Sequence, residues 1–323
     1  MAEKPAKSAS VKSIYDLAEQ TGLATSTISR VLNQRGRISE STRQRVLAAA
    51  RQAGFRPKMS ARQTVVAIVL DRLRYAAYGG FANSMLANLV DQLAERNVAV
   101  EIYTERNVPQ LGSRFIDGVV AMSWEDSTIE QLSGLADVPV VLINRLDQPH
   151  FAAVASDHYQ CGQLVASHLL KQGHREIVCL AEELDWGASQ RIKGMRDTLE
   201  AVGAELPEHA VAFTSHHPCE AALRRLLETK PTALFLAGED LALEGVYTVT
   251  RQMQIRVPQD LAIIGLESPS VCNFTAPPLT TVVQPLAEIA RRALDLVLAD
   301  IAANRRGTQQ VLLDNTLVHR ESS

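Results

Sequence analysis

The amino-acid sequence predicts a chain of two parts, a small all-α head followed by a larger α/β body. The first 56 residues hold short amphipathic segments of helical periodicity, separated by turn residues. Beyond residue 64, short apolar runs alternate with helical segments, which is typical of a doubly wound parallel sheet. The length of 323 residues exceeds one typical domain and suits two or three.

Three short helices are predicted in the head, and each has apolar residues at helical spacing. These residues are Ile14, Leu17 and Ala18, then Ile28, Val31 and Leu32, then Val46, Ala50 and Ala53. The first helix is expected to begin after Val11 and the second to cover about Thr25–Asn33. Gly22 gives the backbone freedom that a tight turn between them requires. Ser39 is a good N-cap for the third helix, and Gly54 suits its C-terminal end.

The second predicted helix leaves a polar face exposed once its apolar stripe is buried. That face carries Thr25, Ser26, Ser29 and Arg30. Two short helices joined by a tight turn, the second with such a face, form a helix-turn-helix, which reads DNA by placing its second helix in the major groove. The head is therefore expected to bind DNA.

The charge distribution also points to a DNA-binding head. The net charge of the chain is −3, but the charges are unevenly distributed. Residues 1–62 carry 12 Lys and Arg and 4 Asp and Glu, whereas the remaining residues carry 21 Lys and Arg and 32 Asp and Glu. A basic head on an acidic body indicates that the head alone meets a polyanion. Several arginines flank the second helix and suit phosphate contacts, which position a protein on DNA without specifying sequence. They are Arg35, Arg37, Arg43 and Arg45.

The composition argues against several other classes. Hydrophobic residues make up 46% and charged residues 21%, as in an ordinary globular protein. No apolar run is long enough to cross a membrane, and the first residues lack the apolar region of a signal peptide. The four cysteines form no CxxC pair, which argues against a zinc site or a disulfide framework and fits a reducing cytoplasm. They are Cys161, Cys179, Cys219 and Cys272.

Seven apolar runs in the body are predicted to be strands, buried on both faces of parallel sheets. They are Val65–Leu70, Val98–Tyr103, Gly118–Met122, Val138–Ile143, Ile177–Leu180, Ala233–Leu236 and Leu261–Gly265. Helical periodicity lies between them, as at Met85–Leu93, Leu164–Leu170 and Ala221–Leu227. About 260 residues of this kind favour two α/β lobes over one.

The head resembles the lactose-repressor (LacI/GalR) family of bacterial transcription regulators. The spacing that carries the resemblance is Ile14-x-Asp16-Leu17-Ala18, Gly22, the run Ser26–Asn33, and Ile38-Ser39-x-x-Thr42-Arg43-x-x-Val46. The resemblance implies that Thr25, Ser26 and Arg30 meet base edges, and the planar fork of arginine suits a guanine edge. The other expected DNA contacts are Ser29, Asn33, Arg37, Lys58 and Arg62.

Two departures from the family pattern concern this head and its connector. Ala24 stands where the family usually has a serine that caps the reading helix, a loss that costs about 0.5–2 kcal/mol. The connector lacks the leucine that wedges into the minor groove in this family, because Thr64 occupies its position. Met59 could substitute for it. The alternative is a simple linker in which Lys58 and Arg62 contact phosphates.

Landmarks along the body resemble the effector domain of the same family, which has the periplasmic-binding-protein fold. They are Ile116–Val120, Pro139–Arg145, His168–Ile177, Arg191–Gly194, Val257–Gly265 and Pro277–Val282. The resemblance implies two lobes, crossover strands near Ala155 and Thr281, and a ligand cleft between the lobes.

The predicted fold is thus a small all-α helix-turn-helix domain followed by a two-lobed α/β domain like the periplasmic binding proteins. The head covers residues 1–56, a short hinge covers 57–64, and the effector-binding and dimerisation domain covers 65–323. One lobe is expected to comprise residues 65–155 plus 284–310, and the other residues 156–283 plus 311–323.

Four residues are assigned to the effector site. By position in the family pattern these include Asn144, Arg191 and Glu267, whose polar groups suit sugar hydroxyls or carboxylates. The alternative is that these side chains fix loops or interlobe contacts. Trp186, expected in a loop just before the Arg191 helix, could stack on a sugar ring or simply pack at the surface. Asp157 is expected to cap a helix at the crossover.

The sequence therefore predicts a DNA-binding transcription regulator, a repressor by preference, controlled by a small effector of the sugar or nucleoside class. A cytoplasmic homodimer reading a near-palindromic operator is expected, with no membrane partner, catalytic site, cofactor or metal. The alternatives are an α/β enzyme or a solute-binding protein with an accessory DNA-binding head. The sequence contains no GxGxxG, Walker or GxSxG motif, which argues against the enzyme. The adjacent His216 and His217 are expected in an exposed loop rather than a metal site.

Overall fold

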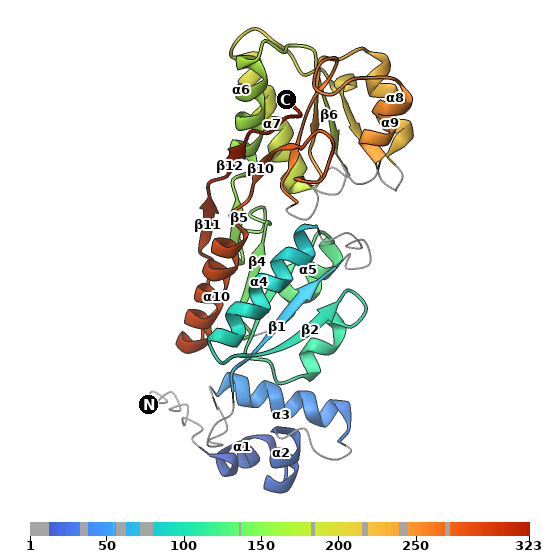
Figure 1. Ribbon diagram of the computed structural model, residues 1–323. Helices are drawn as coiled ribbons and strands as arrows, with labels where there is room; N and C mark the ends of the chain where they lie inside the picture. Colours follow the sequence, from blue (N-terminus) through green and yellow to red (C-terminus); the bar gives the residue numbers. More distant parts are fainter. Residues whose placement is uncertain are drawn as a thin grey trace. The chain divides into compact units, whose positions relative to one another are not determined.

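The computed structural model describes ten stretches of the chain, and the account below concerns these residues. They are 13–32, 38–53, 55, 63–71, 80–135, 137–181, 185–214, 219–238, 245–268 and 272–323. The chain divides into two compact units (Figure 1). The first comprises residues 1–71, 93–141 and 295–307, and the second comprises residues 72–92, 142–294 and 308–323.

The described part of the head contains three helices, drawn in blue in Figure 1, as the sequence predicts. They are α1 (Ile14–Thr21), α2 (Thr25–Leu32) and α3 (Glu40–Gln52). The predicted ends of the second and third helices, Asn33 and Gly54, lie outside the described residues. The helical periodicity therefore located each helix to within about two residues at the ends that are described.

Local hydrogen bonds explain where the helices of the head begin and end. Ser13 Oγ accepts from the N–H of Asp16, and the Asp16 carboxylate accepts from the N–H of Ser13, which is a capping box. Gly22 ends α1 at φ 64°, in the left-handed region that favours glycine. At α3, Ser39 Oγ accepts from the N–H of Thr42, which confirms the predicted cap.

The three helices bury one apolar cluster. Its buried members are Leu17, Ile28, Val31, Leu32, Val46, Leu47, Ala50, Phe55 and Phe115. Phe115 belongs to the body, in the segment just before the strand that starts at Gly118. A head of this size has a small core, so one large aromatic side chain from outside adds materially to the apolar area it buries.

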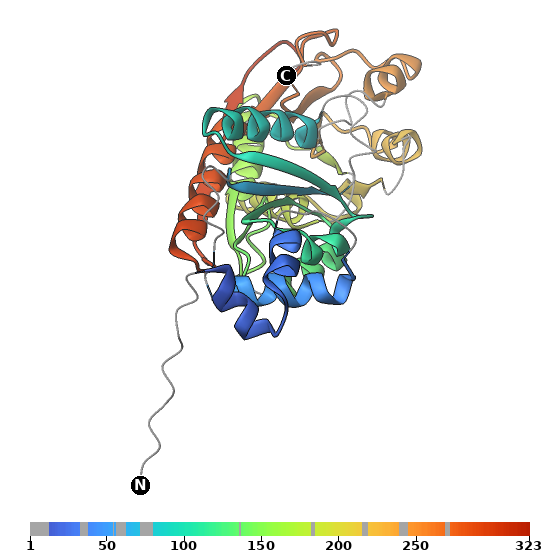
Figure 2. The ribbon, with the colours of Figure 1, turned by 90° about the horizontal axis from the view of Figure 1, so that it is seen from below.

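The body contains two sheets of six strands each among the described residues. The first has the order β11-β5-β4-β3-β1-β2. Its strands are β1 (Val65–Leu70), β2 (Ala99–Thr104), β3 (Gly118–Met122), β4 (Val140–Ile143), β5 (Ala152–Ser156) and β11 (Gln310–Leu313). The strand β1 pairs in parallel with both β2 and β3. Helix α4 (Phe81–Glu95) precedes β2 in the chain, and Figures 1 and 2 show β1 and β2 side by side.

The second sheet has the order β12-β10-β9-β8-β6-β7. Its strands are β6 (Ile177–Ala181), β7 (Val211–Phe213), β8 (Ala233–Leu236), β9 (Ala262–Leu266), β10 (Thr280–Val283) and β12 (Thr316–Val318). Only the β10–β12 pair is antiparallel among the pairs seen in this sheet's described strands. The strands β6, β8 and β9 are completely buried, as expected for the centre of a parallel sheet.

The remaining helices connect the strands. They are α5 (Asp126–Ser133), α6 (His158–Lys171), α7 (Trp186–Glu200), α8 (Glu220–Glu228), α9 (Tyr247–Gln252) and α10 (Leu286–Ala303), with short 3-10 helices η2 (Val108–Ser113) and η3 (Glu208–Ala210). The chain passes from the first sheet to the second after β5 and returns after β10. These are the strands that hold Ala155 and Thr281. The strands β11 and β12 then add one strand to each sheet.

One expectation about burial is wrong. The run Val98–Tyr103 was predicted to be covered on both faces, but β2 is an edge strand, and Ile102 is 46% exposed. An edge strand has a neighbour on one side only, so an apolar run is not enough to show that it is central. The small-residue strand β5 was absent from the predicted runs, because alanine and serine do not form a strong apolar signal.

The caps of α1 and α2 give a matched pair of stability predictions. Removing the Ser13 hydroxyl in Ser13→Ala destabilises α1 by about 0.5–2 kcal/mol, because the capping box is lost. Adding a hydroxyl in Ala24→Ser stabilises α2 by a similar amount, since the Ala24 carbonyl already accepts from the N–H of Ile28 and only the side-chain acceptor is missing. Hydrogen exchange of the full chain measures both: amide protection falls in α1 and rises in α2 by about 2- to 30-fold. Unchanged protection in either helix contradicts the corresponding assignment.

Candidate functional site

The helix α2 presents a polar face opposite its buried one. Ile28, Val31 and Leu32 are at most 9% exposed. Ser26 and Arg30, one turn apart, are exposed, and Thr25 and Ser29 beside them are partly exposed. Four of the predicted DNA contacts therefore share one accessible helix face. The other four, Asn33, Arg37, Lys58 and Arg62, lie outside the described residues, as do Met59, His216 and His217.

Arg191 lies in the first half of α7, close to the carboxyl ends of the strands of the second sheet. Its Nη1 donates to the carbonyl of Ala237, directly after β8, at 2.9 Å. Its Nη2 lies 3.3 Å from Nδ1 of His158. Its Nε is buried and has no partner within the described chain. The guanidinium is thus held in place while part of its donor capacity is unused.

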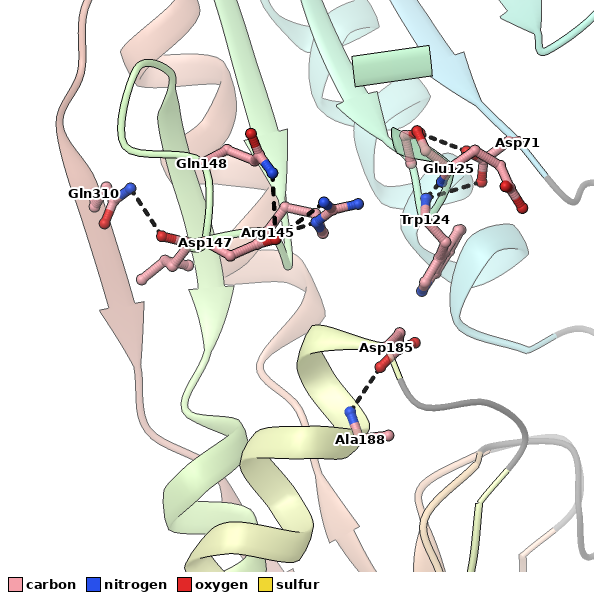
Figure 3. Close-up of polar contacts among 11 residues, drawn as sticks. Asp71, Trp124, Glu125, Arg145, Asp147, Gln148, Asp185, Ala188 and Gln310 are labelled. Carbon is pink, nitrogen blue, oxygen red and sulfur yellow. Dashed lines mark hydrogen bonds and ion pairs between the residues drawn. The ribbon is translucent and has the colours of Figure 1, made fainter. Parts of the chain in front are cut away.

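Trp186 does not lie in a loop, which corrects the expectation from the sequence. It is the first residue of α7. Asp185, directly before it, is the N-cap of the helix, because its carboxylate accepts from the N–H of Ala188 (Figure 3). Its ring meets the ring of His158 edge to face, with centroids 5.3 Å apart.

His158 is the central residue of this group, and sequence reasoning missed it. It is 2% exposed and begins α6, directly after Asp157. Burial lowers its pKa well below the ordinary value, and the neighbouring Arg191 cation lowers it further. The ring is therefore neutral. The one available sequence signal is its place after Asp157, whose carboxylate accepts from the N–H of Gln160 and so confirms the predicted cap of α6.

Two glycines bring the backbones of α6 and α7 into direct contact. A Cβ added at Gly162 would lie 2.0 Å from the carbonyl oxygen of Arg191, and one added at Gly194 would lie 2.0 Å from the carbonyl oxygen of Tyr159. Neither backbone oxygen can move away without displacing its helix. The spacing of the helices, and hence the position of Arg191, depends on these two missing side chains.

Asn144 and Glu267 already have partners. Asn144 Oδ1 accepts from the N–H of Ser156 at 3.2 Å, and its Nδ2 lies 3.4 Å from Oε1 of Gln284. The Glu267 carboxylate accepts two bonds from Arg320, each at 3.0 Å, and a further bond from the hydroxyl of Thr281. These contacts fix neighbouring segments of the fold, and they hold each of the two side chains in one orientation.

A second unforeseen group lies at the carboxyl ends of β1 and β3. Asp71 is 1% exposed and accepts from the Ser123 hydroxyl at 2.5 Å and from the N–H groups of Trp124 and Glu125 at 3.1 and 3.0 Å (Figure 3). The bonds fix the loop after β3 to the end of β1. In open α/β sheets ligands bind at this edge, and an aspartate directly after a buried strand was a signal that could have been used.

The described part of the chain also bears on membrane crossing and metal binding. None of its helices is long and apolar enough to cross a membrane. Within the same residues, no three side chains of His, Cys, Asp or Glu stand together as metal ligands would. The four cysteines are buried and unpaired, and burial raises the pKa of the Cys161 thiol to about 12.

Comparison with known proteins accounts for both parts of the chain. Residues 13–58 match the profile of bacterial regulatory proteins of the lacI family, and residues 166–323 match that of the periplasmic-binding-protein-like domain. The chain therefore has a helix-turn-helix domain of the lacI family of bacterial regulatory proteins, followed by a periplasmic-binding-protein-like domain. It is therefore a DNA-binding transcription regulator controlled by a small ligand, with a helix-turn-helix head and a two-lobed α/β body, as the sequence predicts.

Named transcription regulators align over nearly the whole chain. The transcriptional regulator DegA of Bacillus subtilis is 29% identical, over 96% of this chain and 97% of that protein. The ribose operon repressor of Escherichia coli K12 is 26% identical, over 95% and 98%. Among solved structures, the CelR–cellobiose complex has a TM-score of 0.73 at 27% identity, over 96% of this chain and 99% of the other. The lac repressor dimer on its operator shares the fold, with a TM-score of 0.70 at 21% identity.

Close packing at the two glycines is testable in this protein. Gly194→Ala forces α6 and α7 apart, and overpacking of this kind costs about 1–3 kcal/mol of unfolding free energy. Gly203→Ala is not a suitable control, because that residue has a φ of 71°. Gly112→Ala is suitable, since nothing lies within 4 Å of the added carbon and its φ is ordinary. Denaturant unfolding measures both variants, and equal stability of the two would contradict the contact.

Proposed function

We propose that this regulator is a homodimeric repressor that reads a near-palindromic operator through the exposed face of α2. Ser26 and Arg30 lie one turn apart on that face, opposite the three apolar residues that fix the helix in the head. The proposed base contacts are Thr25, Ser26 and Arg30. The other proposed contacts are Ser29, Asn33, Arg37, Lys58 and Arg62. Two heads in a dimer would read two half-sites.

We also propose a sugar or nucleoside as the effector, bound at the carboxyl edge of the second sheet. The observation that carries this is the Arg191 guanidinium, which is fixed by Ala237 yet keeps a buried Nε without a partner. Trp186 begins the same helix, and its ring lies next to that of His158, where we propose that it stacks on the ring of the effector. Asn144 and Glu267 complete the proposed site, in which their existing bonds would orient them. The CelR structure contains cellobiose, and one relative is named for the ribose operon.

The proposed domain boundaries follow the sheets. The head comprises residues 1–56 and the connector residues 57–64. One proposed lobe comprises residues 65–155 plus 284–310, and the other residues 156–283 plus 311–323. The membership of β12 in the second sheet supports this division, whereas β11 (Gln310–Leu313), which joins the first sheet, favours a last crossing after Leu313. We place the protein in the cytoplasm, where a bacterial regulator meets the chromosome, and assign it no catalytic activity.

Arg30→Ala tests the DNA reading face. The operator is first selected from random duplexes with the full-length protein. The variant then loses most of its preference for the operator over random DNA, since a bidentate arginine–guanine pair contributes about 1–3 kcal/mol of discrimination. Arg45→Ala on α3 removes the same charge and weakens binding to both duplexes equally, because a phosphate contact carries no sequence information. Gel shifts at constant salt measure both, and an unchanged preference in Arg30→Ala contradicts the assignment.

Arg191→Ala tests the effector site. The effector is first found by a thermal-shift screen of sugars and nucleosides, in which a ligand at about 100 times its dissociation constant adds about 2.7 kcal/mol. The variant still binds the operator but no longer binds that compound in calorimetry. Arg196→Ala is the matched control, because Arg196 lies on the same helix and likewise donates to a backbone carbonyl, that of Leu206. Normal binding of the effector by Arg191→Ala would remove this residue from the site.

A further inference from the structure

We propose that His158 is a positioning residue that links Arg191 to Ser156 and Gln284, where the chain passes between its two sheets. The link is a change in which ring nitrogen of His158 carries the proton. The proposal rests on the proposed role of Arg191 in effector binding. It deepens that role by assigning a path from the guanidinium to the strand ends at Ser156 and Gln284. All the groups involved lie in the second unit of the chain.

The hydrogen bonds at the strand ends have only one consistent direction. The N–H of Ser156 can only donate, so the atom of Asn144 that faces it at 3.2 Å is the oxygen Oδ1. The other side-chain atom, Nδ2, therefore faces Gln284 as a donor at 3.4 Å. Gln284 must then present its oxygen Oε1, which can only accept. These assignments do not depend on His158.

The hydroxyl of Ser156 is fixed by the same logic. It lies 2.8 Å from Oε1 of Gln284 and must donate its one proton there. Only the lone pairs of Ser156 Oγ are left for its next neighbour, which is Nδ1 of His158 at 3.3 Å. A hydrogen bond between these two atoms therefore requires a proton on Nδ1.

Arg191 makes the opposite demand on the same nitrogen. Its Nη2 also lies 3.3 Å from Nδ1, and a guanidinium only donates, so this bond requires Nδ1 to be without a proton. The ring cannot satisfy both neighbours in one tautomer. A cationic ring would not satisfy both either, because both of its nitrogens carry protons and neither can accept from Arg191. Burial and the Arg191 charge also lower the pKa of the ring and so disfavour the cation. His158 therefore has two mutually exclusive states.

The state in the free protein is set by the stronger bond. A donor that carries a charge makes a stronger hydrogen bond than a neutral pair does, so Arg191 holds Nδ1 without a proton and the proton resides on Nε2. An effector oxygen that takes Nη2 of Arg191 removes this bond. One proton then leaves Nε2 and one arrives at Nδ1, with no change in charge, and Nδ1 donates to Ser156 Oγ.

The consequence of the exchange reaches three strand ends. Ser156 is the last residue of β5, Gln284 directly follows β10, and Asn144 directly follows β4. In the second state Ser156 is bonded to His158 as well as to both of these residues. The engagement of Arg191 thus adds one hydrogen bond at the place where the chain connects its two sheets.

The tautomer is directly measurable in the full-length protein without any ligand. The protein is labelled with 15N-histidine, and long-range 1H–15N spectra distinguish the protonated from the bare imidazole nitrogen. The His158 signals are assigned by their loss in His158→Phe, which keeps an aromatic ring next to Trp186. The wild type is expected to show the proton on Nε2. Arg191→Met removes the donor and is expected to move the proton to Nδ1.

Two controls separate the path from a general change in structure. Ser156→Ala removes the acceptor and leaves the wild-type tautomer unchanged. Arg191→Met combined with Ser156→Ala loses the preference for Nδ1. A proton on Nδ1 in the wild type overturns the proposal even if no variant folds, and the same tautomer in the wild type and in Arg191→Met overturns it as well. Because no effector is added, failure of the sugar and nucleoside screen would count against the proposed function and leave this measurement intact.

Discussion

The backbone contact between α6 and α7 is the constraint on which the geometry around Arg191 depends. Gly162 and Gly194 each face a carbonyl oxygen of the opposite helix, and no other residue type fits at that distance. The contact sets the approach of α7 to α6, so it also sets the distance from Arg191 to His158. A shift of one helix along the other would break the bond to Ala237 and the ring contact of Trp186 together.

The buried polar groups around this contact are arranged so that nearly every donor meets an acceptor. A buried group without a partner costs about 1–3 kcal/mol, so each exception calls for a physical reason. The Nε of Arg191 is such an exception, next to a neutral histidine that cannot satisfy both of its neighbours. Both incomplete interactions lie at the carboxyl edge of the second sheet, where open α/β folds bind ligands. They are the reason for proposing the effector site at this edge.

The first unit has its own fixed edge, built by a different device. There a buried carboxylate, Asp71, collects one hydroxyl and two backbone N–H groups from the loop after β3. Every donor in that group is satisfied within the unit, so the loop is fixed without a ligand. The two edges therefore differ physically: one is complete in itself, and the other has donor capacity left over.

The sequence by itself determined the helices of the head, the central strands of the body and the exposed polar face of α2. Apolar residues at a spacing of three or four place Ile28, Val31 and Leu32 inside α2, and that geometry leaves Ser26 and Arg30 outside whatever the rest of the fold does. Nearly continuous apolar runs likewise located the central strands, because a strand covered on both faces needs apolar side chains at successive positions. The edge position of β2 was invisible, because it depends on which strand pairs with which.

Only the tertiary structure decided what surrounds each polar side chain. Arg191 was assigned from its position in a family pattern, but nothing local indicates that its neighbours are Ala237, 46 residues away, and His158. The partners of Glu267 and Asn144 are also far away in the chain. They are Arg320 and Gln284, which lie 53 and 140 residues further on. Helix periodicity and caps are set by residues within one turn and can be read from the sequence. Hydrogen bonds between segments depend on how strands and helices pack, and that information appears only when the chain has folded.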